Sequence, residues 1–194
     1  LVLYHLKRQL GLERVRYAVC AAAPASPELF EYFNALGVPL REGYGQTEST
    51  GVIALQRIDR PRWGYVGEPV PGMEVKIDKD GEILTRGPGV FKGYFKDPEL
   101  TASTIKDGWL HTGDVGTIED GFIKILDRKK DIIITAGGKN ITPAFIENKL
   151  KFSSYIQDAV VIGERKKYLV ALILIDEDNV TKHAQDHRIP FTTF

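Results

Sequence analysis

The stretch that decides the fold is GWLHTGDVGTIEDGFIKILDRKKDIIITAGGKN, which spans residues 108–140. It contains a Thr-Gly-Asp turn, an Asp-Gly hairpin turn, five consecutive charges at 127–131 and a glycine turn that presents Lys139. A strand that ends in such a charge run cannot continue into a buried sheet, because each buried charge would need a partner. The pattern predicts that the chain leaves one folded body at Asp127 and enters another near Ile132.

The composition is that of a globular chain. Its 194 residues, 43% of them hydrophobic, can bury a sizeable core in one or two domains. Basic and acidic residues balance at 26 each, so the net charge requires neither nucleic acid nor an anionic membrane as a partner. The single Cys20 excludes an intramolecular disulfide and favours a reducing compartment. We therefore expect a cytoplasmic protein, with membrane association left open.

The first residues have the pattern of a helix that is already under way. LVLYHLKRQLG is amphipathic and Gly11 is a typical helix end, while the first residue is not Met. No apolar run has the length needed to span a bilayer. We expect that the chain begins inside a larger folded body, which would hold part of the chemistry.

Residues 14–45 have the pattern of a strand, a helix and a second strand. VRYAVC is β-rich, Ser26-Pro27 is a typical helix start, Gly37 is a typical helix end, and VPLREGYG leads into a glycine-rich loop. This order predicts a βαβ unit with a right-handed crossover. Ligands gather beyond the carboxyl ends of the strands in such units, which is where CAAAP and GYGQTE lie.

Residues 60–126 are rich in Pro and Gly and hold short alternating segments. The Asp80-Gly81 turn joins MEVKI to EILTR, Asp97-Pro98 begins a short helix, and Asp120-Gly121 joins two further strands. These signals predict a small antiparallel sheet or a distorted, barrel-like one.

Residues 132–194 have the pattern of a compact α+β module. DIIIT and NI flank Gly137-Gly138 as a hairpin, a helix begins at Thr142-Pro143, and AVVIG and YLVALILID follow as strands. The predicted fold class is α/β with α+β. We expect residues 1–126 to be the C-terminal part of a large domain that contains a βαβ unit and a β-barrel-like part. Residues 127–131 would form a hinge, and residues 132–194 an incomplete, mobile α+β domain.

The loop GYGQTE combines the groups that a nucleotide site needs. Gly43 and Gly45 allow close backbone approach, Tyr44 offers an aromatic face, Thr47 a hydroxyl for phosphate and Glu48 a carboxylate for a metal. An equally good interpretation from the loop alone is a strand-to-helix turn in which Thr47 or Glu48 caps the helix.

Thr112-Gly113-Asp114 has two interpretations as well. The Asp114 carboxylate could accept hydrogen bonds from paired hydroxyls such as those of ribose. An Asx-turn that bonds its own backbone is the commoner role of such a tripeptide. The charge run at 127–131 could likewise be a solvated surface or a hinge, and 137–139 an ordinary turn or a loop beside a ligand.

Several function classes lack their signatures. The four histidines do not form a metal-ligand set, and we interpret His183 and His187 as surface residues on one helix face. The sequence has neither a Walker-type phosphate loop nor a GxGxxG after a strand, and it has no Gly-x-Ser-x-Gly nucleophile turn. Ordinary P-loop, dinucleotide-binding and hydrolase readings are therefore disfavoured.

Taken in order, four motifs resemble the AMP-forming adenylate superfamily of acyl-CoA synthetases, luciferases and peptide-synthetase adenylation domains. They are AAAP at 21–24, GYGQTE at 43–48, WLHTGD at 109–114, and DRKKD at 127–131 with AGGKN at 136–140. The resemblance covers essentially the whole chain. RxGYGQTE with KDIIITAGGKNITP is most similar to the long-chain fatty acyl-CoA synthetases, whose reaction forms an acyl-adenylate from ATP and then a CoA thioester.

The resemblance implies a site for ATP and AMP. Small side chains would line the adenine and the acyl entrance, and the glycine-rich loop would hold the base, with Tyr44 stacked on it. The residues concerned are Ala22, Ala23, Pro24, Gly43, Tyr44 and Gly45. Thr47 would bond the α-phosphate, Glu48 would hold Mg²⁺, and Asp114 and Arg128 would bond the ribose hydroxyls.

The resemblance also implies a moving C-terminal domain. Lys130 matches the position at which that domain pivots between an adenylating and a thioester-forming pose. Gly137, Gly138 and Lys139 would then swing toward the pantetheine channel of CoA. An exposed charged residue suits a pivot, because its φ and ψ can change without the loss of a buried contact.

Two departures from the family pattern limit what this chain would do alone. The upstream Ser/Thr/Gly-rich phosphate loop is absent, and the late lysine of the C-terminal domain has no match, since Lys182 lacks the expected glycine neighbour. We expect the chain alone to be inactive. Synthetases for aryl or amino acids and a non-catalytic nucleotide-binding module remain alternatives. The expected partners are a fatty acid, ATP and CoA, and not nucleic acid; a peripheral membrane contact and a homodimer are left open.

Overall fold

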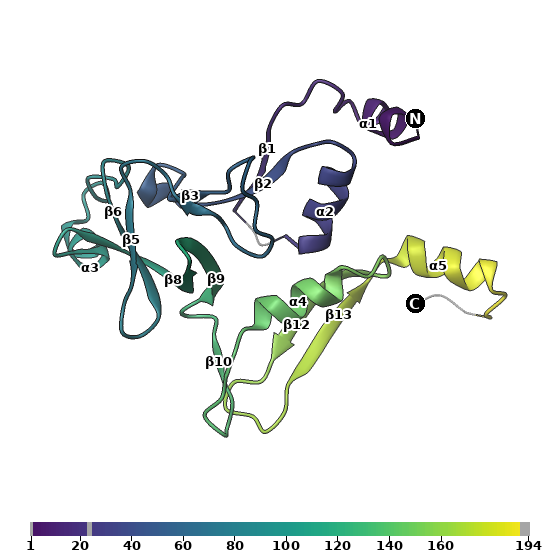
Figure 1. The fold of residues 1–194 in the computed structure, drawn as a ribbon. Helices are drawn as coiled ribbons and strands as arrows, with labels where there is room; N and C mark the ends of the chain where they lie inside the picture. Colours follow the sequence, from purple (N-terminus) through teal and green to yellow (C-terminus); the bar gives the residue numbers. More distant parts are fainter. Residues whose placement is uncertain (1, 23–24, 191–194) are drawn as a thin grey trace. The chain divides into compact units, whose positions relative to one another are not determined.

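The computed structural model describes residues 2–22 and 25–190. The chain forms two compact units, Leu1–Lys130 and Asp131–Phe194 (Figure 1). Within the described ranges, the structure contains no helix that is both long and apolar enough to cross a membrane.

The first unit opens with the predicted βαβ arrangement. Strand β1 (Ala18–Cys20) lies parallel to β2 (Leu40–Tyr44), with Ala18 opposite Leu40 and Cys20 opposite Glu42. Helix α1 (Val2–Gln9) precedes β1, and helix α2 (Pro27–Ala35) connects β1 to β2. The short strands β3 (Ala54–Leu55) and β4 (Glu68–Pro69) extend the sheet in the order β1-β2-β3-β4. The strand–helix–strand prediction is therefore confirmed, with a first strand shorter than expected.

A second, antiparallel sheet completes the first unit. Its strands run in the order β5-β6-β8-β7, and β9 also pairs with β8, so the described strands form no closed barrel. The elements are β5 (Glu74–Ile77), β6 (Glu82–Arg86), α3 (Pro98–Thr104), β7 (Ile105–Lys106), β8 (Trp109–Glu119) and β9 (Phe122–Arg128). The predicted Asp-Gly turns do join β5 to β6 and β8 to β9, and Asp97 caps α3 by accepting from the Leu100 N–H at 2.9 Å.

One hydrophobic core joins the two sheets of this unit. Ile53, Ile83 and Ile123 are fully buried, and Tyr44 from the end of β2 packs in the same cluster. Burying one such aliphatic side chain stabilises a fold by about 1.5–3 kcal/mol. Because Tyr44 belongs to this core, the end of β2 is fixed against β6 and β9.

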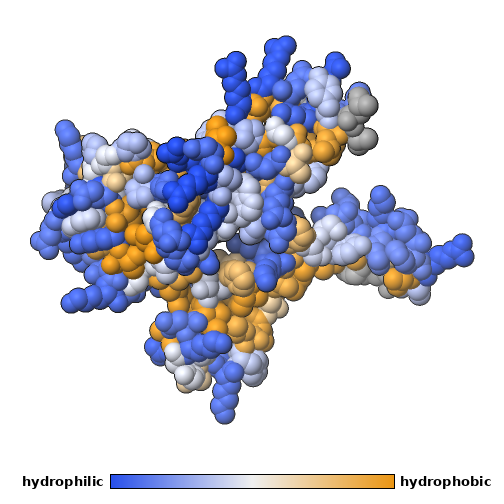
Figure 2. Space-filling view, in the orientation of Figure 1, coloured by the Kyte–Doolittle hydropathy of each residue, from blue (hydrophilic) through white to orange (hydrophobic). Residues whose placement is uncertain are grey.

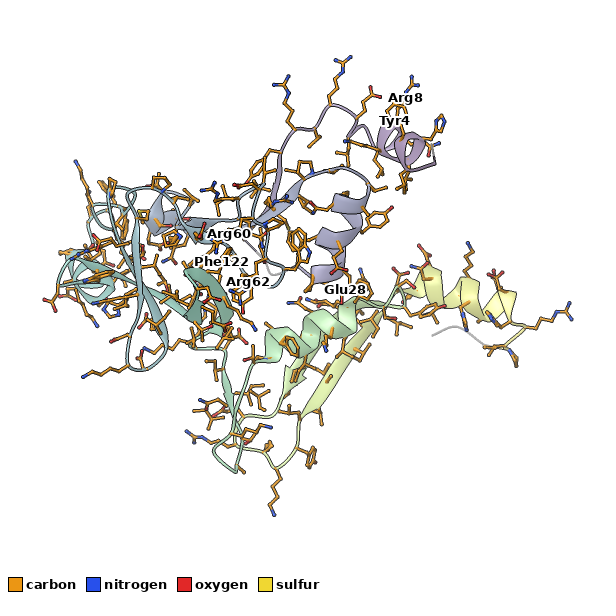
Figure 3. All side chains as sticks on the ribbon, in the orientation of Figure 1. Tyr4, Arg8, Glu28, Arg60, Arg62 and Phe122 are labelled. Carbon is orange, nitrogen blue, oxygen red and sulfur yellow. The ribbon has the colours of Figure 1, made fainter. Side chains whose placement is uncertain are left out.

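Cation–π contacts link the segment before β4, which contains Arg60 and Arg62, to its neighbours. Arg60 and Arg62 lie beside Phe122 of β9 (Figure 3), with guanidinium carbons 4.8 and 5.4 Å from the ring centroid. Trp63 stacks on Phe30 of α2 at 6.0 Å. These contacts hold the long connection between β3 and β4 to helix α2 and to strand β9.

The second tryptophan, Trp109, is the first residue of β8. The Lys76 ammonium is 4.1 Å from the centroid of the Trp109 ring, and the Arg86 guanidinium carbon is 4.6 Å from it. This half-buried ring therefore contacts two cationic side chains, one from β5 and one from β6.

The second unit is a small α+β module, as predicted. Its elements are β10 (Ile133–Ile134), β11 (Asn140–Ile141), α4 (Pro143–Lys151), β12 (Ile156–Ile162), β13 (Val170–Ile175) and α5 (Glu177–Asp186). Helix α4 packs on β12, where Glu147 accepts a hydrogen bond from the Val161 N–H at 2.8 Å. Strand β13 is apolar yet exposed, with Leu172 63% accessible, and Figure 2 shows apolar surface over this part of the unit.

Candidate nucleotide site

The Thr-Gly-Asp segment lies inside strand β8 and is not the turn that the sequence predicts. The pairing of β6 with β8 shifts register between Glu82 and Leu84, and Gly113 adopts a φ of 73°. The Thr112 hydroxyl donates to the Ile83 carbonyl at 2.7 Å and accepts from the Asp114 N–H at 3.1 Å. The irregular strand, held by a threonine hydroxyl, thus replaces the predicted turn.

Asp114 is held at the centre of the site. Its side chain is almost fully buried; Oδ2 accepts from the Tyr44 hydroxyl at 2.7 Å, and Oδ1 pairs with Arg128 Nε at 2.8 Å. Arg128 lies directly opposite Asp114 in the β8–β9 pairing. The structure therefore brings together three of the predicted site residues, which come from three strands.

The electrostatics of Asp114 follow from this burial. Desolvation raises the pKa of Asp114, and the nearby Glu82 charge adds to the rise, while Tyr44 and Arg128 oppose it. Burial and the Asp114 charge together raise the pKa of Tyr44. A carboxylate offers about four lone-pair sites, so two protein donors leave room for further donors such as hydroxyls.

The GYGQTE loop follows β2 into the short 3₁₀ helix η1 (Thr47–Ser49). A Cβ at Gly45 would lie 2.4 Å from the Gly51 carbonyl oxygen, so the chain itself already requires glycine there. The Ser49 hydroxyl accepts from the Gln46 N–H at 3.0 Å. The side-chain bond at the start of η1 thus comes from Ser49, and not from Thr47 or Glu48 as in the alternative interpretation.

Glu48 has a partner that sequence reasoning missed. The Tyr94 hydroxyl donates to Glu48 Oε1 at 2.7 Å, and this bond raises the pKa of Tyr94. Thr47 is exposed beside it. No local signal in the sequence links Tyr94 to a loop more than forty residues earlier.

The metal that the family pattern implies fits this donor set in part. No group of three or more potential His, Cys, Asp or Glu ligands is present in the described ranges. One oriented carboxylate, Glu48, is nevertheless what a magnesium ion needs when substrate phosphates and water supply its other ligands.

The segment after β1 is only partly described. Ala22 adopts a left-handed φ of 75°, which is uncommon for a residue with a Cβ. Ala23 and Pro24, the other two predicted residues of this segment, lie outside the described residues.

Glu42, next to the predicted loop, is a buried carboxyl group that sequence reasoning did not single out. Desolvation raises the pKa of Glu42 to about 7, against the opposing effect of a hydrogen bond from the Ala25 backbone. The Glu42 N–H donates to Gln56 Oε1 at 3.3 Å. Four consecutive residues of β2, from Arg41 to Tyr44, are buried, so no alternation in the sequence marks Glu42 as an interior residue.

The remaining predicted residues lie on exposed turns. Lys130 is exposed at the last position of the first unit. Gly137, Gly138 and Lys139 form the turn between β10 and β11, in which the Thr135 N–H donates to the Lys139 carbonyl at 3.0 Å. Their proposed roles with CoA stay predictions.

Comparisons with known proteins agree with these motifs. The family described as AMP-binding enzyme matches residues 3–95, and its C-terminal domain matches residues 130–190. The long-chain-fatty-acid–CoA ligase FadD15 of Mycobacterium bovis is 42% identical over 92% of this chain and 30% of its own length. Human long-chain-fatty-acid–CoA ligase 1 is 38% identical over 95% of this chain and 28% of its own.

A solved structure shows the same fold. The o-succinylbenzoate CoA synthetase of Bacillus subtilis, in complex with its acyl-adenylate intermediate, is 29% identical with a TM-score of 0.80, covering 95% of this chain and 42% of that one. The present chain thus spans about 30% of the length of the two curated relatives. With both family domains matched in order, the chain belongs to the AMP-binding enzyme family.

Proposed function

We propose that the natural full-length protein activates a fatty acid with ATP and transfers the acyl group to CoA. The observation that carries this proposal is the buried Asp114 carboxylate, bonded by Tyr44 and Arg128, within a chain about 40% identical to long-chain-fatty-acid–CoA ligases. In the first step the fatty carboxylate attacks the α-phosphorus of ATP and pyrophosphate leaves. In the second step the CoA thiol displaces AMP from the acyl-adenylate.

The ribose of the nucleotide is the group that we assign to Asp114. Its carboxylate is acceptor-only, and Arg128 and Tyr44 hold it in one orientation, so the two ribose hydroxyls can donate to it without a rearrangement. The exposed guanidinium of Arg128 offers a further donor to the same hydroxyls.

The phosphates belong to the loop after β2. The exposed Thr47 hydroxyl would donate to the α-phosphate, and Glu48, oriented by Tyr94, would hold Mg²⁺. When bound, the ion would compensate phosphate charge as the carboxylate attacks. The adenine would lie against Gly43, Tyr44 and Gly45, and Ala22, Ala23 and Pro24 would line the adenine and the acyl entrance.

CoA would be served by the second unit. Lys130 would act as its pivot, and the exposed turn of Gly137, Gly138 and Lys139 offers unhindered backbone to the pantetheine arm. We place the protein in the cytoplasm, and we leave a peripheral membrane contact and a homodimer as secondary proposals.

A different acid is the second candidate. The solved relative is named for o-succinylbenzoate, an aromatic carboxylic acid, so membership of the family does not itself select a fatty acid. A non-catalytic nucleotide-binding role is the third, because Asp114 and Glu48 could bind a nucleotide without any turnover.

Pyrophosphate release separates these candidates. The natural full-length protein should release pyrophosphate from ATP when palmitate is added, and much less with benzoate, o-succinylbenzoate or amino acids. Release with an aryl or amino acid alone would replace the fatty acid in the proposal. A folded protein that binds AMP without any carboxylate-dependent release would favour the binding role.

A further inference from the structure

A buried carboxylate lies behind the strand that presents Asp114. Glu82 begins β6 and is only 6% accessible. Its Oε1 accepts from the Gly113 N–H at 2.9 Å, one residue before Asp114. The His111 Nδ1 lies 3.2 Å from Oε2 of the same carboxylate. Glu82 thus contacts the strand on both sides of Thr112.

Lys129 joins the same group from the end of β9. Its Nζ donates to Glu82 Oε2 at 3.0 Å and to Asp80 Oδ2 at 2.6 Å. The Lys129 N–H also donates to the Gly113 carbonyl at 2.8 Å. Gly113 is therefore bonded on both sides, by Glu82 through its N–H and by Lys129 through its carbonyl.

The Lys129 ammonium lies between two carboxylates, those of Asp80 and Glu82. Burial disfavours the ionised form of Glu82, but hydrogen bonds from Lys129, Gly113 and His111 outweigh it and lower the pKa of Glu82. The bonds to Asp80 and Glu82 raise the pKa of Lys129. Glu82 is thus charged and fully bonded at neutral pH, which makes it a fixed anchor for neighbouring backbone.

We propose that Glu82 and Lys129 are positioning residues that hold the irregular Gly113 segment so that the Asp114 carboxylate faces the ribose hydroxyls of the nucleotide. The inference rests on the proposed ribose role of Asp114. Neither side chain contacts Asp114 among the described hydrogen bonds and ion pairs, so they act through the Gly113 backbone and through Arg128, which adjoins Lys129.

The backbone geometry explains why Gly113 alone would not hold the Asp114 carboxylate in one orientation. Gly113 has a φ of 73°, in a region where glycine is free to move. A free glycine one residue before the binding carboxylate would let that carboxylate turn. The Glu82 side chain bonds the Gly113 N–H, and the Lys129 N–H, one residue beyond β9, bonds the Gly113 carbonyl. These bonds hold the peptide units on either side of Gly113 before the ligand arrives, which lowers the entropy lost on binding.

The test compares AMP with 2′,3′-dideoxy-AMP, which lacks both ribose hydroxyls, by titration calorimetry on the natural full-length protein. The variants are Glu82→Gln, Lys129→Met and the double variant, with Lys129→Arg as the conservative change. Glu74→Gln is the matched control, because Glu74 lies in the same sheet and pairs with Arg86 away from Gly113. Thermal unfolding of each variant checks the fold.

We expect Glu82→Gln and Lys129→Met each to weaken AMP binding roughly tenfold while leaving dideoxy-AMP binding unchanged. The double variant should lose little more than either single variant, because the Lys129 ammonium acts on Gly113 through the Glu82 carboxylate. Lys129→Arg should recover most of the affinity, and Glu74→Gln should behave as the wild type. Lys129→Met keeps the test open should Glu82→Gln fail to fold, since the Lys129 side chain is 44% accessible.

Three different results would overturn the inference, and they are distinguishable. If the wild type distinguishes AMP from dideoxy-AMP but the variants retain that preference, the positioning role fails and the ribose role of Asp114 stands. If the variants weaken both ligands equally, their role is structural only. If the wild type itself shows no preference, the ribose role fails together with the positioning role built on it.

Discussion

The residues assigned to the nucleotide and those assigned to CoA are held in opposite ways. Asp114 is buried in the first unit and bonded by Tyr44 and Arg128. The turn at 137–139 in the second unit is exposed, and a Cβ at Gly138 would meet no heavy atom of the described residues within 4 Å. The Asp114 carboxylate is thus fixed by two other strands, while the turn is held by the Thr135 hydroxyl, which accepts from the Lys139 N–H, and by the Lys166 carbonyl, which accepts from the Ala136 N–H.

The difference teaches where substitutions should act through charge and where through backbone conformation. In the first unit, the carboxyl groups of Glu42, Glu82 and Asp114 are buried, so substitutions there change the free energy of desolvation and of charge pairing. In the second, the relevant side chains are absent or in water, so φ is the variable that matters. The predictions below test this division from the largest expected effect to the smallest.

Replacing the buried carboxyl of β2 should change stability most. The pKa of Glu42 is raised to about 7 by burial, so its contribution to stability is complete below the ordinary pKa and is lost as pH rises through about 7. That loss is about 3 kcal/mol. Glu42→Gln should abolish this pH dependence in urea unfolding followed by circular dichroism between pH 4.5 and 8. An equally steep profile in the variant would show that another group is responsible.

Removing the central carboxylate should weaken the nucleotide strongly. Asp114→Ala deletes the acceptor of the Tyr44 and Arg128 bonds, and AMP affinity should fall about 100-fold, which corresponds to a lost charged hydrogen bond. Titration calorimetry on the natural full-length protein measures it. Asp59→Ala, which removes an exposed carboxylate paired with Arg57, is the control and should bind AMP normally. An unchanged AMP affinity in Asp114→Ala would contradict the ribose role of Asp114.

Fixing the proposed pivot should separate the two half-reactions. Lys130→Pro locks φ near −65°, whereas Lys130→Ala leaves it free. We expect thioester formation to fall roughly tenfold in the proline variant while pyrophosphate release is spared. Single-turnover assays of the two steps measure this, with Lys130→Ala as the control. Equal loss of both steps would argue against a pivot at this residue.

Replacement of the left-handed Gly138 in the exposed turn should have the smallest effect on stability. Gly138 has a φ of 75°, so Gly138→Ala should destabilise the β10–β11 hairpin by about 1 kcal/mol. Gly137→Ala, at a neighbouring position with equal space, should cost less because no positive φ is required there. Amide hydrogen exchange at Lys139 reports the difference. Identical exchange in both variants would mean that the turn shape does not depend on Gly138.

Local signals predicted much of this fold. The Asp-Gly pairs at 80–81 and 120–121 identified the β5–β6 and β8–β9 hairpins of the second sheet, and the glycines at 137 and 138 identified the β10–β11 hairpin. Asp97 was a readable helix cap, because its acceptor and the Leu100 N–H are three residues apart. Each of these signals depends only on neighbours in the sequence.

The parts that sequence reasoning missed depend on strand register. A Thr-Gly-Asp tripeptide in isolation has the composition of a turn, and only its pairing with β6 makes it an irregular strand. Glu82 becomes an anchor because the fold brings Gly113 and Lys129 to it from positions 31 and 47 residues away. The roles of Asp114 and Arg128 came from resemblance to a family, whereas their direct pairing came from the structure.

The placement of the aromatic side chains has a practical consequence. Both tryptophans of the chain, the stacked Trp63 and the cation-flanked Trp109, belong to the first unit, while Tyr155 and Tyr168 are the tyrosines of the second. Intrinsic fluorescence excited at the red edge of the absorption band therefore observes one unit and is blind to the other. A change in tryptophan emission of this chain during a titration can therefore be attributed to the first unit without any engineered probe.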